Sequence, residues 1–160
     1  TTLAQLVYND ERVEKHFDLE VWVCVSGLFD VFMVMKTILE AVTLSNYDIK
    51  DLNQLQVKLK ETLTEKKFLL VLDDVWDKTY ARWKVLSNTF KCGAQGSKVI
   101  VTTHDQEVAS VMFASAIHRI VELPEDDCWS LFAKYAFHNG NSDERLKLEA
   151  LGIEIVKKCK

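Results

Sequence analysis

The segment Phe68–Leu72 is a run of five apolar residues, and two aspartates, Asp73 and Asp74, follow it directly. A continuous apolar run of this length is typical of a strand that is buried on both faces of a parallel sheet. In open α/β sheets, ligands bind at the edge formed by the carboxyl ends of the strands. The run therefore predicts an inner strand that brings two carboxylates to a ligand-binding edge.

The rest of the first 122 residues predicts strands that alternate with helices. Further strands are expected at Leu19–Val25, Lys98–Thr102 and Ile117–Val121. Apolar residues at helical spacing indicate helices at Leu3–Val7, Val31–Val42, Leu52–Leu63, Tyr80–Phe90 and Val108–Met112. Because strands and helices alternate, crossover connections are expected, and they favour an α/β fold with a doubly wound parallel sheet.

After Pro124 the sequence changes character. Cys128–Ala136 and Leu148–Cys159 each carry an apolar stripe at helical spacing, and no strand is expected beyond the proline. We therefore expect two domains, residues 1–122 and residues 123–160, the second of them helical. The chain starts directly in a helical pattern and stops at the end of another, so we expect it to be a piece of a larger protein.

Composition and charge exclude several classes of protein. The chain is 48% hydrophobic and 28% charged, which is typical of a globular protein and not of a disordered one. Its 20 basic and 24 acidic residues are mixed without a basic tract, so no nucleic-acid partner is indicated. No apolar run approaches the length of about 20 residues that a membrane-spanning helix needs.

The cysteines are too far apart to suggest a zinc site or a disulfide framework. They are Cys24, Cys92, Cys128 and Cys159. Histidines His16, His118 and His138 likewise have no partners at the spacing of metal ligands. Reduced thiols are the simplest interpretation, and they indicate a cytoplasmic protein.

The adjacent acids Asp73 and Asp74 allow two interpretations. Neighbouring carboxylates repel each other and are costly to bury unless a cation or hydrogen bonds compensate. A Mg²⁺ ion bound to phosphate would compensate, as in the Walker B arrangement of nucleotide-binding proteins. Alternatively, one of the two aspartates caps the next helix. The residues alone leave both possibilities open.

Hydroxyl residues occur at two further positions where phosphate could bind. Thr1 and Thr2 open an amphipathic helix, as does the hydroxyl residue that binds Mg²⁺ after a phosphate-binding loop. The alternative is an ordinary threonine cap. Thr102, Thr103 and His104 follow a predicted strand, where they could sense a terminal phosphate or simply end the strand and open a helix.

Five segments, taken in order, resemble the NB-ARC domain of plant disease resistance proteins of the NBS-LRR type. They are Thr1–Ala4 (TTLA), Phe17–Ser26 (FDLEVWVCVS), Phe68–Asp77 (FLLVLDDVWD, the kinase-2 motif), Gly96–Thr103 (GSKVIVTT) and Leu123–Phe132 (LPEDDCWSLF). Together they cover nearly the whole chain. The form WVCVS and Trp76 at the end of kinase-2 are typical of the coiled-coil rather than the TIR type of receptor.

The resemblance implies a P-loop NTPase-like fold in which the first strand and the phosphate loop lie outside this chain. It also implies a switch that holds ADP at rest and ATP when active, with Mg²⁺, in an intracellular immune receptor. ATP hydrolysis would be slow at most and confined to the full-length parent protein, so we expect the chain alone to be inactive. Its partners would be nucleotide and the parent's coiled-coil, ARC and leucine-rich-repeat domains, with possible oligomerisation of the parent on activation.

The resemblance also assigns roles by position. Thr1 and Asp73 would hold Mg²⁺, Thr2 would approach the α-phosphate, and Asp74 would be the catalytic acid that orients the hydrolytic water. The phosphate-side residues would be Thr102, Thr103 and His104. His104 departs from the family, which usually has arginine there; because arginine is always charged and histidine mostly neutral at pH 7, phosphate sensing at this position is expected to differ.

Two other classes of function compete with the nucleotide switch. The chain could be an interaction module of the same architecture that no longer handles nucleotide, a possibility motivated by His104 and by the absence of the phosphate loop. A metabolic P-loop enzyme is disfavoured, because no substrate-binding residues can be named.

Overall fold

A computed structural model describes residues 1–25, 27, 29–137 and 142–158 of the 160-residue chain. These residues form two compact units, 1–117 and 118–160, which we describe separately. His138 and Cys159 lie outside the described residues. The boundary expected at residue 122 stays a prediction.

The first unit is built on a three-stranded parallel sheet in the order β1-β2-β3. The strands are β1 (Leu19–Cys24), β2 (Phe68–Asp73) and β3 (Lys98–Val101). Every residue of the middle strand β2 is buried, as its apolar run predicts. The parallel register pairs Cys24 with Asp73 and Leu72 with Val101, so the strands end at a common edge. The strands β1 and β3 end one residue before their predicted ends, which is within the usual uncertainty of element boundaries.

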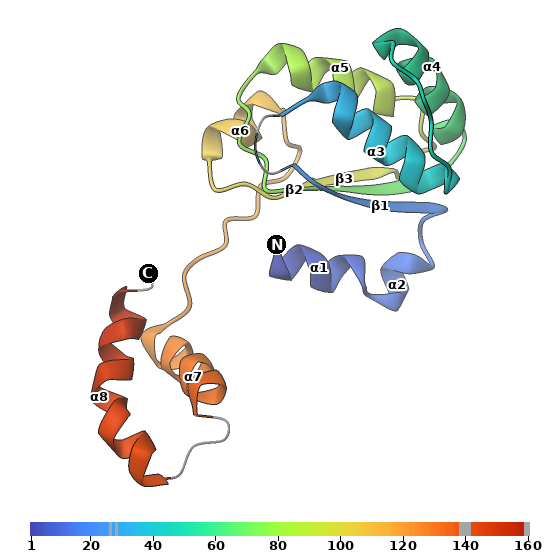
Figure 1. Cartoon of the computed structure of the whole chain (residues 1–160). Coiled ribbons are helices and arrows are strands. Elements are labelled where there is room, and N and C mark those ends of the chain that lie inside the picture. Colours follow the sequence, from blue (N-terminus) through green and yellow to red (C-terminus); the bar gives the residue numbers. More distant parts are fainter. Residues whose placement is uncertain (26, 28, 138–141, 159–160) are drawn as a thin grey trace. The chain divides into compact units, whose positions relative to one another are not determined.

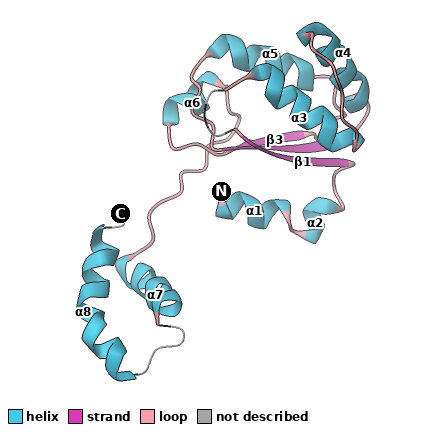
Figure 2. Cartoon of the chain, viewed as in Figure 1, coloured by secondary structure: helices cyan, strands magenta, loops and turns pink. Residues whose placement is uncertain are grey.

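Helices cover both faces of this sheet (Figures 1 and 2). One face carries α3 (Val31–Thr43), α4 (Leu52–Leu63), α5 (Tyr80–Phe90) and α6 (Gln106–Val111). The opposite face carries α1 (Thr2–Tyr8) and α2 (Glu11–Glu14). The side chains of β2 alternate between the two cores, because Phe68, Leu70 and Leu72 pack on the first face while Leu69 and Val71 pack on the second. The first unit is therefore a mixed α/β fold, as expected.

The α3 and α4 helices form where the sequence places apolar side chains three or four residues apart. The buried residues of α4 are Leu55, Leu59 and Leu63, which lie one above another on a single helical face. Each helix also begins with an aspartate cap: the Asp30 carboxylate accepts the N–H of Phe32, and the Asp51 carboxylate accepts the N–H of Gln54. The structure thus confirms the helices predicted at Val31–Val42 and Leu52–Leu63.

The strand expected at Ile117–Val121 is wrong. No strand follows β3 in the described part of the chain, and Ile120 and Val121 are 72% and 82% exposed. The segment has the β-branched composition of a strand, but strand propensity acts through pairing and packing against neighbours. The sheet of the described residues ends at β3, and the segment pairs with none of its strands.

The second unit is a pair of helices, α7 (Glu125–Ala136) and α8 (Ser142–Lys158), which confirms the helices predicted after Pro124. Trp129 and Phe132 of α7 form an aromatic cluster with Phe137, the residue that follows the helix. The α8 residue opposite this cluster is Gly152, whose missing side chain lets the rings come close. Across the described residues, no helix is both long and apolar enough to cross a membrane.

Candidate functional site

The candidate site is centred on Asp73, the last residue of β2. The Asp73 residue is only 5% exposed, because the buried strand carries it to the sheet edge while flanking segments cover it. Its carboxylate accepts hydrogen bonds from two hydroxyls: Thr1 Oγ1 lies 3.0 and 3.1 Å from its two oxygens, and Thr102 Oγ1 lies 2.6 Å from Oδ1. Three segments that are far apart in sequence therefore meet at one buried carboxylate.

Thr1 lies at the start of α1, next to Asp73. It is the cap residue of α1, but its side chain makes no capping hydrogen bond and points to Asp73 instead. Thr2, the first residue of α1, is exposed. Of the two threonines, the described contacts thus bring only Thr1 to the carboxylate.

Thr102 connects the two aspartates. While its hydroxyl donates to Asp73, the same oxygen accepts the backbone N–H of Asp74 at 2.9 Å. The Thr102 backbone also continues the ladder beyond β3, since its N–H donates to the Leu72 carbonyl at 3.0 Å and its carbonyl accepts the N–H of Val75 at 2.9 Å. These bonds fix the chain on both sides of the acidic pair.

Asp74 turns away from Asp73 through an uncommon backbone conformation. Its φ is 62°, in the left-handed region, which aspartate tolerates better than most non-glycine residues. The Asp74 carboxylate then accepts the indole N–H of Trp76 at 2.9 Å. Neither aspartate caps the following helix, because the cap residue of α5 is Thr79. The capping interpretation of the pair is therefore wrong.

Thr103 and His104 face other groups. The Thr103 hydroxyl accepts the N–H of Asp105 at 3.0 Å, at the turn that leads into α6. The exposed ring of His104 stacks on the indole of Trp76, with the ring centroids 5.5 Å apart and the planes 20° from parallel. The structure thus brings Thr102 to Asp73, but it places Thr103 in a turn and His104 against an aromatic ring.

Trp76 is a residue of this region for which the sequence predicts no role in the site. Its indole is 52% exposed, so burial in a core does not explain its position. The sequence offers two signals for a contact here. Trp76 is an aromatic residue three positions after Asp73, and His104 is a ring-bearing residue directly after Thr103. Since the two segments follow neighbouring strands, their rings can meet at the same edge of the sheet.

An ion-pair cluster ties the loop after β2 to α6. The Lys78 ammonium lies 2.6 Å from Asp105 and 2.7 Å from Glu107. These hydrogen bonds raise the pKa of Lys78, and the hydrogen bond from Lys78 lowers the pKa of Asp105. The cluster therefore joins the two loops that carry Trp76 and His104.

The groups around Asp73 are oxygen donors, the type of ligand that Mg²⁺ takes in proteins. Among the described residues there is no group of three or more histidine, cysteine, aspartate or glutamate side chains of the kind that encloses zinc or calcium. Mg²⁺ usually takes one or two carboxylates and completes its shell with phosphates and water. One buried carboxylate with the Thr1 hydroxyl 3.0 Å away fits that pattern.

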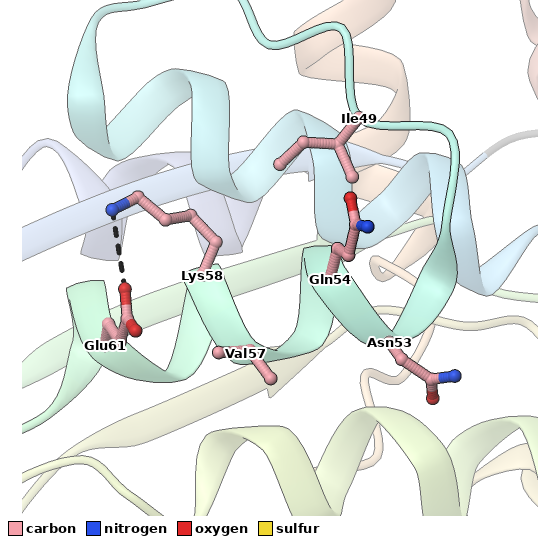
Figure 3. Close-up of a pocket in the computed structure, with 6 residues that line it drawn as sticks. All are labelled: Ile49, Asn53, Gln54, Val57, Lys58 and Glu61. Carbon is pink, nitrogen blue, oxygen red and sulfur yellow. Dashed lines mark hydrogen bonds and ion pairs between the residues drawn. The ribbon is translucent and has the colours of Figure 1, made fainter.

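A shallow hollow on α4 involves different residues (Figure 3). It is lined by Ile49, Asn53, Gln54, Val57, Lys58 and Glu61. Its two charged groups pair with each other, since Lys58 Nζ lies 3.4 Å from Glu61 Oε2. It shares no residue with the Asp73 site.

Comparison with known proteins identifies the family. The NB-ARC domain family profile matches residues 1–142. The chain is 46% identical over its whole length to putative disease resistance RPP13-like protein 1 of Arabidopsis thaliana, of which it covers 15%. It is 42% identical over 99% of its length to disease resistance protein RGA2 of Solanum bulbocastanum, of which it covers 16%. The chain spans about a sixth of the length of these relatives. It belongs to the NB-ARC domain family.

Proposed function

We propose that this chain is part of an ADP/ATP-binding switch in a plant immune receptor, and that it supplies the acidic and hydroxyl groups on the Mg²⁺ side of the nucleotide. The observation that carries the proposal is the buried Asp73 carboxylate, to which the hydroxyls of Thr1 and Thr102 both donate. A buried acid at the carboxyl end of an inner parallel strand lies where such folds bind ligands. Membership of a nucleotide-binding family supports the same conclusion.

Thr1 and Asp73 are proposed to hold Mg²⁺, directly or through water. The ion would offset the negative charge of the phosphates and the buried carboxylate together. The Thr1 hydroxyl now donates to the carboxylate, so it would rotate to present a lone pair to the metal. Thr102 keeps Asp73 oriented, because its hydroxyl donates to the Asp73 carboxylate while its backbone is bonded to Leu72 and Val75.

The other proposed roles concern the hydrolytic water and the phosphates of the nucleotide. Asp74 is proposed to orient the hydrolytic water, Thr2 to approach the α-phosphate, and Thr103 and His104 to lie on the phosphate side. Such roles depend on fixed positions more than on chemical reactivity, because phosphoryl transfer is catalysed mainly by positioning and charge stabilisation. The left-handed backbone of Asp74 supports a specific role, since strained conformations concentrate at functional sites.

At the level of the parent protein, we propose a cytoplasmic receptor of the coiled-coil type that holds ADP at rest and ATP when active. Coiled-coil, ARC and leucine-rich-repeat domains would be its intramolecular partners, and activation could involve oligomerisation. Any ATP hydrolysis by the parent would be slow. The relatives support this proposal, because they are named as disease resistance proteins and are about six times as long as the chain.

The test uses the full-length parent protein with Asp73→Asn, which removes the charge but keeps the size. Affinity for ADP is measured with Mg²⁺ and with chelator. We expect about a tenfold or greater loss of affinity in Mg²⁺ and little change in chelator, because only the metal-linked contribution is removed. Asp48→Asn is the matched control, since the Asp48 side chain is 89% exposed and outside the site.

Equal affinities of wild-type protein and Asp73→Asn in Mg²⁺ would contradict the proposed role of Asp73. A wild-type protein that is purified without nucleotide, and binds none, would contradict the switch itself. That second result would favour the nucleotide-independent interaction module.

A further inference from the structure

Trp76 and His104 form a stacked pair beside the acidic residues, and no role in the site described so far requires it. Trp76 follows β2 and His104 follows β3, so the pair joins the loops after two adjacent strands. Its ring planes are 20° from parallel. The indole is half exposed, one of its faces lies against the His104 ring, and its N–H is directed at Asp74.

We infer that Trp76 is a positioning residue: its indole N–H holds one oxygen of the Asp74 carboxylate, and His104 braces the indole. This inference rests on the proposed function, in which Asp74 orients the hydrolytic water. The contact is a 2.9 Å hydrogen bond from Trp76 Nε1 to Asp74 Oδ1. Bonds between a neutral donor and an ionised acceptor are stronger than bonds between neutral groups.

The chemistry of the indole suits this task. An indole N–H can donate but has no lone pair with which to accept. The indole can therefore hold Oδ1 in place, but it cannot itself accept a proton from the attacking water. Oδ2 is the oxygen left to accept that proton, since no bond to it is observed among the described residues.

The backbone restrains Asp74 from the opposite side. Thr102 accepts the Asp74 N–H at 2.9 Å and so fixes the left-handed turn at this residue. With the backbone held by Thr102 and the carboxylate held by Trp76, the direction of the Asp74 side chain is set at both ends. Positioning of this kind matters because a displacement of about 1 Å can slow an enzymatic step by about a hundredfold.

This arrangement also gives a role to the departure from arginine at position 104. A histidine ring next to Thr103 is flat, and it lies against the indole face. His104 thereby acts on Asp74 through Trp76. The aromatic side chain at position 104 supports the acid, whatever its charge.

The test compares single-turnover ATP hydrolysis by the full-length parent and by Trp76→Phe, which keeps a ring against His104 but loses the N–H donor. We expect the rate constant to fall about tenfold, with the dissociation constants of ATP and ADP within about twofold of wild type. In an Asp74→Asn background, Trp76→Phe should cause no further loss, because the residue acts through Asp74. His104→Ala, which removes the ring stacked on the indole, should also lower the rate.

A second measurement reports the contact without any turnover. In protein labelled with 5-fluorotryptophan, the ¹⁹F resonance of Trp76 is assigned by its loss in Trp76→Phe, and it should shift in Asp74→Asn and in His104→Ala. The tryptophan of the second unit, Trp129, should not shift, and Trp129→Phe serves as the matched control for hydrolysis.

Three results would overturn the inference: wild-type rates in Trp76→Phe, an equal loss in the Asp74→Asn background, or an unmoved Trp76 resonance in Asp74→Asn. Failure of the proposed function has a different signature, which is a wild-type protein that binds no nucleotide or an Asp74→Asn variant that hydrolyses ATP normally. In that case the positioning role fails too, while a shift of the Trp76 resonance would still identify the hydrogen bond.

Discussion

The Thr102 hydroxyl lies 2.6 Å from Asp73 Oδ1 and is the donor of that hydrogen bond. Because the same oxygen also accepts the N–H of Asp74, one side chain orients the first acid and the backbone of the second. This double contact makes Thr102 the residue on which the geometry of the acidic pair most depends.

Thr102→Val is therefore expected to destabilise the protein as well as to weaken the site. Valine has nearly the same shape but leaves the Asp74 N–H without its acceptor, and it removes one of the two hydroxyls that donate to Asp73 Oδ1. We expect the free energy of unfolding to fall by about 1–3 kcal/mol, measured by chemical denaturation of the parent's nucleotide-binding domain. Thr102→Ser, which keeps the hydroxyl, is the control and should lose much less. Equal losses in both variants would assign the effect to the methyl group.

The sheet could be predicted because its evidence is local. The run Phe68–Leu72 is apolar at every position, a pattern typical of a strand that is buried on both faces of a parallel sheet. The expectation at Ile117–Val121 used only the β-branched residues of that segment, but a strand also needs a neighbour with which to pair. Pairing is a property of the whole sheet, so composition alone was insufficient there.

The site was predicted only in part for a similar reason. Thr102 and Thr103 are neighbours in an extended segment, where successive side chains point in opposite directions. One hydroxyl therefore reaches Asp73, while the other accepts the N–H of Asp105. Both rings can be seen in the sequence, but Trp76 and His104 are 28 positions apart, and it is the pairing of β2 with β3 that brings them together.

Glu20 on β1 should make the stability of the first unit depend on pH. Burial, with a smaller contribution from the charge of Glu14, raises the pKa of Glu20 above its ordinary value. Its Oε1 atom is buried, and no hydrogen-bond partner is found for it among the described residues. Between the ordinary and the raised pKa, the folded protein keeps a proton that the unfolded chain releases, so stability falls as the pH rises through that window.

Glu20→Gln should remove this loss, since glutamine does not ionise. The melting temperature of the variant is expected to exceed that of wild type at pH 7 and to approach it at pH 4. Glu11→Gln, a change at an exposed position of α2, is the control. A difference between Glu20→Gln and wild type that is the same at both pH values would contradict the assignment.

Lys78 should control the ionisation of Asp105. The hydrogen bond from Lys78 is the largest cause of the lowered pKa of Asp105, so Lys78→Met is expected to raise that pKa towards its ordinary value. A carboxylate with a lowered pKa stabilises the fold above its ordinary pKa, and the contribution is lost as the pH falls through the folded value. The ¹³C resonance of the Asp105 carboxyl, followed by NMR during acid titration, measures the change. Lys84→Met is the control, because Lys84 lies over the Tyr80 ring; an equal shift in both variants would exclude a specific pairing.

Gly152 should be essential to the close packing of the two helices in the second unit. A Cβ atom at this position would lie 2.8 Å from a ring carbon of Phe132 and 2.8 Å from one of Trp129, so the rings must move. Alanine is favoured over glycine within a helix by about 1 kcal/mol, but overpacking of this kind costs about 1–3 kcal/mol. We expect Gly152→Ala to lower amide-hydrogen protection in α7 and α8, and Gly152→Val to lower it further. Ala150→Gly, two positions away on the same helix and exposed, separates the two effects, because it loses helix propensity without adding a ring contact. If Gly152→Ala instead increases protection, helix propensity outweighs the ring contact, and the aromatic cluster can relax at little cost.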